Sequence, residues 1–270
     1  MKKALILILL FPLISYSQLY ISEDFEDYNY GDSISVVSPN FSLWSGNEIE
    51  DVLVDNVQSN SGSNSLYLES LDDLPIPGGP QDIVLEFGEL LDDGELTIST
   101  SFFIPSGKGA YFNLQGDTTI GNIWTTDFTF NSDGTLNLTS IEEDDFEFNF
   151  PFDTWFNLRL EINLNYNSLD LFLDDELQTS LTLNYFSNHP IAGIDFYPIQ
   201  GNEFWIDDVL VSHTPSEDLL NIDLSFLDVS PGPLSGNLIE NNFYIALGDS
   251  FYYDFFIYNN GLDTIYSFDI

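Results

Sequence analysis

The 270-residue chain is strongly acidic: it holds 45 Asp and Glu residues against 4 Lys and Arg, a formal net charge of −41, and it has no cysteine. This excess of negative charge argues against nucleic-acid binding, because phosphate contacts need Lys and Arg. The lack of cysteine excludes a disulfide framework, a thiolate metal site and a cysteine nucleophile. Two uses of the carboxylates remain: an acidic coat that keeps the protein soluble, or calcium ligation at particular positions.

The N-terminus has the pattern of a secretory signal. Lys2 and Lys3 precede an apolar run over 4–14, and "SYSQ" follows with small residues at the positions that signal peptidase requires. We predict that residues 1–17 are a signal peptide, cleaved before Gln18. The apolar run is too short to span a bilayer, and no later stretch approaches about 20 apolar residues. We therefore expect a secreted or outer-surface protein with no transmembrane segment in the mature chain.

After the signal, short alternating runs of apolar residues are separated by Gly, Asn, Asp and Pro. This pattern is typical of an antiparallel β-sandwich. Asp-Gly pairs between the runs supply the positive φ angles that tight hairpins need. The predicted strands cover residues 64–70, 82–88, 95–105, 109–115, 127–131, 135–140, 154–164, 168–174, 177–183, 191–197 and 203–211.

The domain organisation follows from one break in this pattern. Residues 18–212 are predicted to form an all-β, antiparallel jelly-roll sandwich. A polar, proline-bearing stretch over 213–221 reads as a linker. Beyond it, 222–270 holds too few strand-like runs for an independent sandwich, so we expect a partial second β segment that is truncated.

The predicted strand 203–211 raises a question of charge. It is rich in apolar β-formers, yet it contains Asp207 and Asp208 side by side. Successive side chains of a strand point to opposite faces, so one carboxylate is expected to face the core. Few cations are present to neutralise it. Backbone N–H groups, water or a metal ion must then satisfy the charge.

An ordered set of short motifs resembles a known family. The chain is similar to secreted bacterial surface proteins that carry a laminin-G-like, concanavalin A-like lectin/glucanase module, common among cargo of the type IX secretion pathway. The resemblance covers roughly residues 19–212, and the tail is similar to the immunoglobulin-like segment that follows such modules. It rests on "EDFEDYNYGD", "SGSNSLYLE", "IPSGKGAYFNLQ", "FDTWFNLRLEINLNYNSLDLFLDDELQ" and "IDFYPIQGNEFWIDDVLV".

The resemblance implies a structural calcium ion where the first and last strands of the module meet. The corresponding stretches here are 23–26 and 205–208, where carboxylates interrupt apolar runs. Calcium takes six to eight oxygen ligands. The predicted metal ligands are Asp24, Glu26, Asp207 and Asp208, with one of the last two facing inward. The alternative is that one Asp accepts backbone N–H bonds at a frayed edge while the other faces water.

A sugar site needs an aromatic platform beside hydrogen-bonding groups, because a sugar ring has an apolar face and a polar rim. The predicted ligand-binding residues are Tyr111, Asn113, Gln115 and Trp124, expected on a concave face. Trp155 lies in an alternating run and is expected in the core. A second acidic stretch, 141–150, is expected to form a solvated hairpin tip.

No catalytic motif is found in the sequence. Laminarinase-like members of the superfamily carry Glu-x-Asp-x-x-Glu on one strand, and that spacing does not occur here. His189 and His213 read as loop residues. We therefore expect a non-catalytic module that binds a polysaccharide, more readily a neutral one than an anionic one because of the chain's own charge. The alternatives are a structural spacer in a larger secreted peptidase or adhesin, and a polysaccharide hydrolase.

Overall fold

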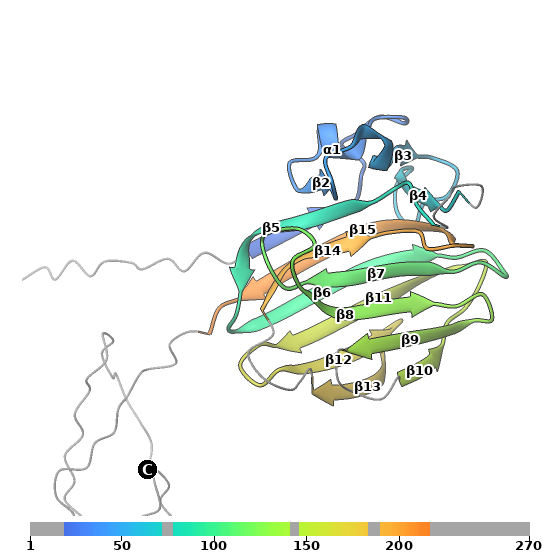
Figure 1. Cartoon of the computed structure of the whole chain (residues 1–270). Coiled ribbons are helices and arrows are strands. Elements are labelled where there is room, and N and C mark those ends of the chain that lie inside the picture. The colour runs from blue at the N-terminus through green and yellow to red at the C-terminus, as the bar shows by residue number, and fades with distance from the viewer. Residues whose placement is uncertain (1–18, 72–77, 141–145, 183–189, 217–270) are drawn as a thin grey trace, which may run out of the picture. The chain divides into compact units, whose positions relative to one another are not determined.

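The computed structural model describes residues 19–71, 78–140, 146–182 and 190–216, and all statements below concern these residues (Figure 1). The chain divides into two units, 1–215 and 216–270. The predicted signal peptide and the predicted partial β segment lie outside the described residues. No helix in the described part of the chain is long and apolar enough to cross a membrane.

The fold is a jelly-roll-like sandwich of two antiparallel sheets, as predicted. The eight-stranded sheet has the order β13-β12-β11-β6-β15-β4-β3, and β1 also pairs with β15. Its strands are β1 (Leu19–Glu23), β3 (Val54–Asp55), β4 (Ser65–Glu69), β6 (Glu95–Phe103), β11 (Trp155–Asn163), β12 (Ser168–Leu173), β13 (Glu176–Thr182) and β15 (Glu203–Thr214).

The seven-stranded sheet packs against the first and has the order β10-β9-β8-β7-β14-β5-β2. Its strands are β2 (Phe41–Leu43), β5 (Ile83–Leu91), β7 (Ala110–Gln115), β8 (Trp124–Phe130), β9 (Thr135–Ser140), β10 (Phe146–Asn149) and β14 (Ile191–Phe196). Two short helical turns, α1 (Ile34–Val37) and η1 (Glu48–Glu50), lie in the connections near the N-terminus (Figure 1).

Alternation along the strands builds the core. In β11, for example, Phe156, Leu158 and Leu160 are buried while their neighbours are more exposed. Phenylalanine rings join the two sheets at the centre. Phe102 of β6 has its ring centroid 5.7 Å from Phe112 of β7 and 5.0 Å from Phe130 of β8. Fully burying each such ring contributes about 1.5–3 kcal/mol, so this cluster holds the sheets together.

All eleven predicted strands are present, with ends that differ by a few residues. In the acidic stretch 141–150, residues 146–149 form β10 against β9. The four consecutive acids for which a hairpin tip is predicted, 142–145, lie outside the described residues. His213 is not a loop residue either, because β15 continues to Thr214. Its ring is buried, and Nε2 lies 2.7 Å from the carbonyl oxygen of Asp93.

Candidate functional site

The outer face of the seven-stranded sheet carries polar side chains from several neighbouring strands. Core residues of β7 such as Phe112 and Leu114 alternate with Tyr111, Asn113 and Gln115, which therefore share the outer face. The register sets Asn113 of β7 opposite Asp195 of β14 on one side and Asp127 of β8 on the other. The three predicted β7 residues thus do lie together on one sheet face.

These side chains form a hydrogen-bonded network. Tyr111 Oη donates to Asp127 Oδ1 at 2.7 Å, and Asn113 Nδ2 donates to Asp195 Oδ2 at 2.6 Å. Gln115 Nε2 donates to Asn113 Oδ1. Burial and the neighbouring Asp127 raise the pKa of Tyr111, so its hydroxyl stays protonated. The network is a fixed polar layer on this face.

Burial decides which predicted residues can touch a ligand. Asn113 and Gln115 are each only 1% exposed, and both are hydrogen-bonded. Their polar groups are bonded to neighbouring side chains and are not free to contact a ligand. Tyr111 is half-buried, whereas Trp124 at the start of β8 is 45% exposed. Of the four predicted ligand-binding residues, Trp124 is the most accessible.

The 116–123 loop, between β7 and β8, covers part of this face. The amide of Gly116 donates to the carbonyl of Ile123 at 2.8 Å, closing the loop at its base. The amide of Gly121 donates to Gln115 Oε1 at 2.9 Å, which fixes the loop to the polar layer. Gly121 has a φ of +75°, and a Cβ there would lie 2.7 Å from the ring of Trp44. Only glycine lets the loop approach this ring.

Trp44 and Trp124 form an aromatic pair in which the ring of Trp124 is exposed. Their ring centroids are 5.9 Å apart and their planes differ by 8°. Trp44 follows β2 and is half-buried, while Trp124 comes from the far side of the 116–123 loop. Parallel indole rings with solvent-exposed surface offer the flat apolar platform on which a sugar ring packs.

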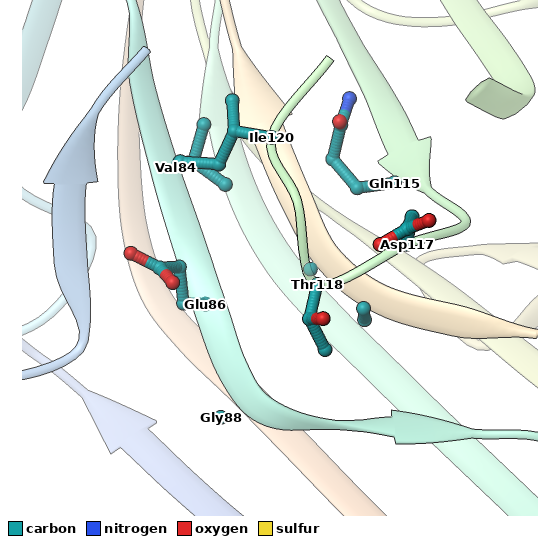
Figure 2. Close-up of a pocket in the computed structure, with 9 residues that line it drawn as sticks. Val84, Glu86, Gly88, Gln115, Asp117, Thr118 and Ile120 are labelled. Carbon is teal, nitrogen blue, oxygen red and sulfur yellow. The ribbon is translucent and has the colours of Figure 1, made fainter. Parts of the chain in front are cut away.

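A small pocket opens beside the loop. Its volume is about 60 Å³, and its lining includes Val84 and Glu86 of β5, Gln115, Asp117, Thr118 and Gly193. Figure 2 shows Glu86 on the β5 ribbon and Asp117 and Thr118 on the loop across from it. The hydrogen bonds that Asp117 accepts from the Thr119 amide and Asn122 hold the pKa of its carboxyl below the usual value. The pocket therefore keeps a negative charge at its edge.

Two acids on the outer face of the seven-stranded sheet, Asp82 and Asp195, share a hydrogen bond. Asp82, just before β5, lies beside Asp195, which is 4% exposed. Burial raises the pKa of both carboxyls, and the charge of Asp195 raises that of Asp82 further. Oδ1 of each acid has no hydrogen-bond partner among the described residues. A proton shared between the two carboxyls removes one of the two buried charges.

Sequence reasoning missed Trp44, Glu86, Asp117 and the Asp82–Asp195 pair. Asp82 and Asp195 each stand in a predicted strand, and the period-2 pattern does place both on the outer face. That signal was available. The meeting of Trp44 with Trp124 was not, because it depends on the path of the 116–123 loop.

The predicted metal ligands lie where β1 meets β15, and the structure shows there how the charges of Asp207 and Asp208 are satisfied. Ile21 pairs with Val211, so the first and last strands of the module are neighbours as expected. A β-bulge interrupts β15 between Asp207 and Leu210, and Asp208 has a φ of +50°. The bulge breaks the alternation. Both carboxylates consequently reach the same loop, not opposite faces of the sheet.

The 56–64 loop supplies the hydrogen bonds for these acids. Asp207 is fully buried; its Oδ2 accepts from the amides of Asn60 at 2.8 Å and Ser61 at 3.1 Å, and its Oδ1 accepts from the amide of Asp208 at 2.7 Å. Asp208 accepts from Ser61 Oγ at 2.6 Å and Asn60 Nδ2 at 2.7 Å. Burial raises the pKa of Asp207 to about 6 despite these bonds.

Glu26 is bound by the other end of the same loop. Its Oε1 accepts from the amides of Ser63 and Asn64, both at 2.7 Å. Asp24 Oδ1 accepts from the Glu26 amide at 3.2 Å. No group of three or more His, Cys, Asp or Glu residues in the described part of the chain is arranged to hold a metal ion. Asp207 Oδ2 and Glu26 Oε1 each accept two amide hydrogen bonds, so these two oxygens are already occupied. The predicted calcium ion stays a prediction.

Trp155 is not in the core between the sheets. It is half-buried on the outer face of the eight-stranded sheet, where it pairs with Phe103, and the centroids of the two rings are 5.7 Å apart. Phe103 in turn contacts Trp205, whose Nε1 donates to Asp55 Oδ2 at 2.7 Å. The prediction was wrong because the alternating run fits either face, and Phe156 is the residue that points inward.

Comparisons with known proteins identify the fold. No family model and no curated protein matches the chain. Among solved structures, the T. cruzi calreticulin globular domain is similar with a TM-score of 0.50 and 13% identity, over 75% of this chain and 90% of that one. A sialidase matches at a TM-score of 0.48 and 14% identity, over 68% of this chain but only 18% of the sialidase.

The galectin LEC-6 of Caenorhabditis elegans is also similar, with a TM-score of 0.39 and 12% identity, over 51% of this chain and 95% of the galectin. At such identities the likeness concerns the fold alone. The chain has a two-sheet β-sandwich fold similar to that of the calreticulin globular domain.

Proposed function

We propose that this chain is a non-catalytic carbohydrate-binding module that packs a glycan on the outer face of the seven-stranded sheet. The observation that carries the proposal is the parallel Trp44–Trp124 pair, in which Trp124 is exposed, on the sheet face that also holds the pocket lined by Glu86 and Asp117. A sugar ring places its apolar face on the indole and its hydroxyls near Glu86, Asp117 and Thr118.

The state of the carboxyl groups supports binding without catalysis. Retaining glycosidases hold two carboxyls about 5 Å apart on either side of the scissile bond. Asp82 and Asp195 instead hydrogen-bond to each other, and Asp195 is 4% exposed. Two carboxyls that are hydrogen-bonded to each other leave no room for a glycosidic bond between them.

The charge of the chain supports a ligand that is not anionic. Lys108 pairs with Glu203 at 2.8 Å, and Arg159 pairs with Glu161 and Asp175, so the two cations of the mature chain are engaged with acids of the eight-stranded sheet or its turns. Sulfated and uronate polymers would meet an unrelieved negative field at the pocket. Neutral glycans are the first class to test.

The same proposal includes export and display. The N-terminal charged and apolar pattern supports a protein that is secreted or held at the outer surface. We also propose that the chain carries a laminin-G-like module and is exported through the type IX pathway.

Affinity gel electrophoresis of the full chain through neutral, sulfated and uronate polysaccharides tests the binding. We expect retardation by at least one neutral polymer, lost in Trp124→Ala and weakened in Trp44→Ala. Trp155→Ala is the matched control, because it removes a half-buried tryptophan from the other sheet. Retention that survives Trp124→Ala, or migration unchanged in every polymer, contradicts the proposal.

A further inference from the structure

We propose that the pocket beside the 116–123 loop recognises an amino-sugar polymer through a free ammonium group. This inference rests on the proposed function, since it names the ligand class for the same site. Three features carry it: an unpaired carboxylate at the pocket, a pocket of a size that suits a substituent, and an aromatic platform next to both.

Glu86 is the unpaired carboxylate. It is exposed on β5 and borders the pocket. Within the described residues its side chain makes no hydrogen bond or ion pair, although its backbone amide donates to the carbonyl of Asn40 at 2.9 Å. Asp117 adds a second charge, held ionised by its hydrogen bonds within the loop. Both residues line the pocket, so a cation that enters it lies in the field of two negative charges.

No basic side chain of the described residues offsets these charges at the pocket. Lys108 precedes β7, at the end of that strand away from Gln115, and its ammonium lies 2.8 Å from Glu203. The guanidinium of Arg159 lies 3.9 Å from the ring centroid of Phe172 on the other sheet. Neither cation lines the pocket. The electrostatic potential at the pocket is therefore negative and favours a positively charged ligand group.

The size of the pocket selects a substituent over a ring. Its volume of about 60 Å³ has room for a few water molecules, whereas sites that enclose a whole small molecule measure about 300–1,000 Å³. An ammonium group fits the pocket while the pyranose ring that carries it stays outside. The exposed face of Trp124 is then available to that ring, and the face of an indole also attracts a cation.

Titration calorimetry with three β-1,4-linked hexasaccharides tests the inference. Hexamers of glucosamine, N-acetylglucosamine and glucose have the same backbone and differ only in the group at carbon 2. At about pH 5.5 the amines are charged. We expect the full chain to bind the glucosamine hexamer at least about tenfold more tightly than the other two, a factor that corresponds to roughly 1.4 kcal/mol.

Two charge-matched variants separate the pocket from the overall charge of the protein. Glu86→Gln should remove most of the preference for glucosamine. Glu147→Gln removes the same charge from β10, at the opposite edge of the same sheet, and should leave it unchanged. Both positions are exposed, so neither change should disturb the fold.

The outcomes distinguish the two proposals. If the acetylated or neutral hexamer binds as tightly as the amine, the amino-sugar inference is wrong while the carbohydrate-binding function stands. If Glu86→Gln and Glu147→Gln weaken the amine equally, the attraction is a property of the whole surface and the inference is again wrong. If no hexamer binds and no polysaccharide retards the chain, both proposals are wrong.

Discussion

The carboxyl of Asp82 hydrogen-bonds to the carboxyl of Asp195, next to the β7 network that Tyr111 and Asn113 build. Two acids brought together in a partly buried site can coexist only when one of them keeps its proton. The pair therefore links the stability of this sheet face to pH.

Asp82→Asn should change how stability depends on pH. Burial and the charge of Asp195 raise the pKa of Asp82 to about 9. The folded chain thus holds a proton that the unfolded chain releases near pH 4, and the free energy of unfolding falls as the pH rises from about 4 to about 9. An asparagine amide can donate to Asp195 at every pH. We expect the variant to lose this part of the decline and to exceed the wild type in stability at pH 8.

Urea unfolding at a series of pH values measures this effect. Asp170→Asn, on β12 of the other sheet, is the control and should keep the wild-type slope. A wild-type slope in Asp82→Asn would show that the pair shares no proton.

Calcium should have little effect on thermal stability. The oxygens of Asp207 and Glu26 that face the 56–64 loop are occupied by amide donors. We expect the full chain to melt at the same temperature in chelator and in millimolar calcium. A rise in calcium that disappears in Asp207→Asn would instead establish the site predicted from the sequence and would require the loop to rearrange.

Gly62→Ala should destabilise the chain through Glu26. Gly62 has a φ of +53°, and a Cβ there would lie 2.2 Å from Glu26 Cδ. The carboxylate must move and lose the amides of Ser63 and Asn64, at a cost of about 1–3 kcal/mol beyond the backbone strain. Gly46→Ala is the matched control, because its φ is +78° and nothing lies within 4 Å of its Cβ position. Equal losses in denaturant unfolding would mean that contact with Glu26 contributes nothing.

Phe102→Ala should be among the most damaging single changes. Phe102 is fully buried and contacts rings of both sheets, so its removal leaves a cavity that costs about 3–5 kcal/mol. Phe172→Ala, which removes a half-buried ring from the outer face of β12, should cost far less. Denaturant unfolding of the two variants makes the comparison; similar losses would mean that the cluster around Phe102 is not the centre of the core.

The strands could be predicted because each presents one apolar face, and alternation records that face directly. Phe156, Leu158 and Leu160 show the pattern in β11. The same rule gave the wrong orientation for Asp207 and Asp208, since a bulge adds one residue that periodicity alone does not reveal. It also could not tell the core from the outer aromatic face, which is why Trp155 was misplaced.

The candidate site was predicted in part. Tyr111, Asn113 and Gln115 were predicted as ligand-binding residues, and the structure places all three on one face of β7. Their burial could not be predicted, because it depends on the 116–123 loop, which helps to cover them. A hydrogen bond from the Gly121 amide to Gln115 Oε1 and the close approach of Gly121 to Trp44 hold this loop in place. Contacts between segments distant in sequence leave no local pattern.

The last two strands of the sandwich occupy central positions. β14 fits between β5 and β7, and β15 fits between β6 and the pair β1 and β4. The seven-stranded sheet cannot be completed until the chain has been made to Phe196, and the eight-stranded sheet until it has been made to Thr214. The contact order is therefore high, and folding is expected to be slow. A shortened version ending before β15 leaves the edges of β6, β4 and β1 unpaired, and we expect it to aggregate through them.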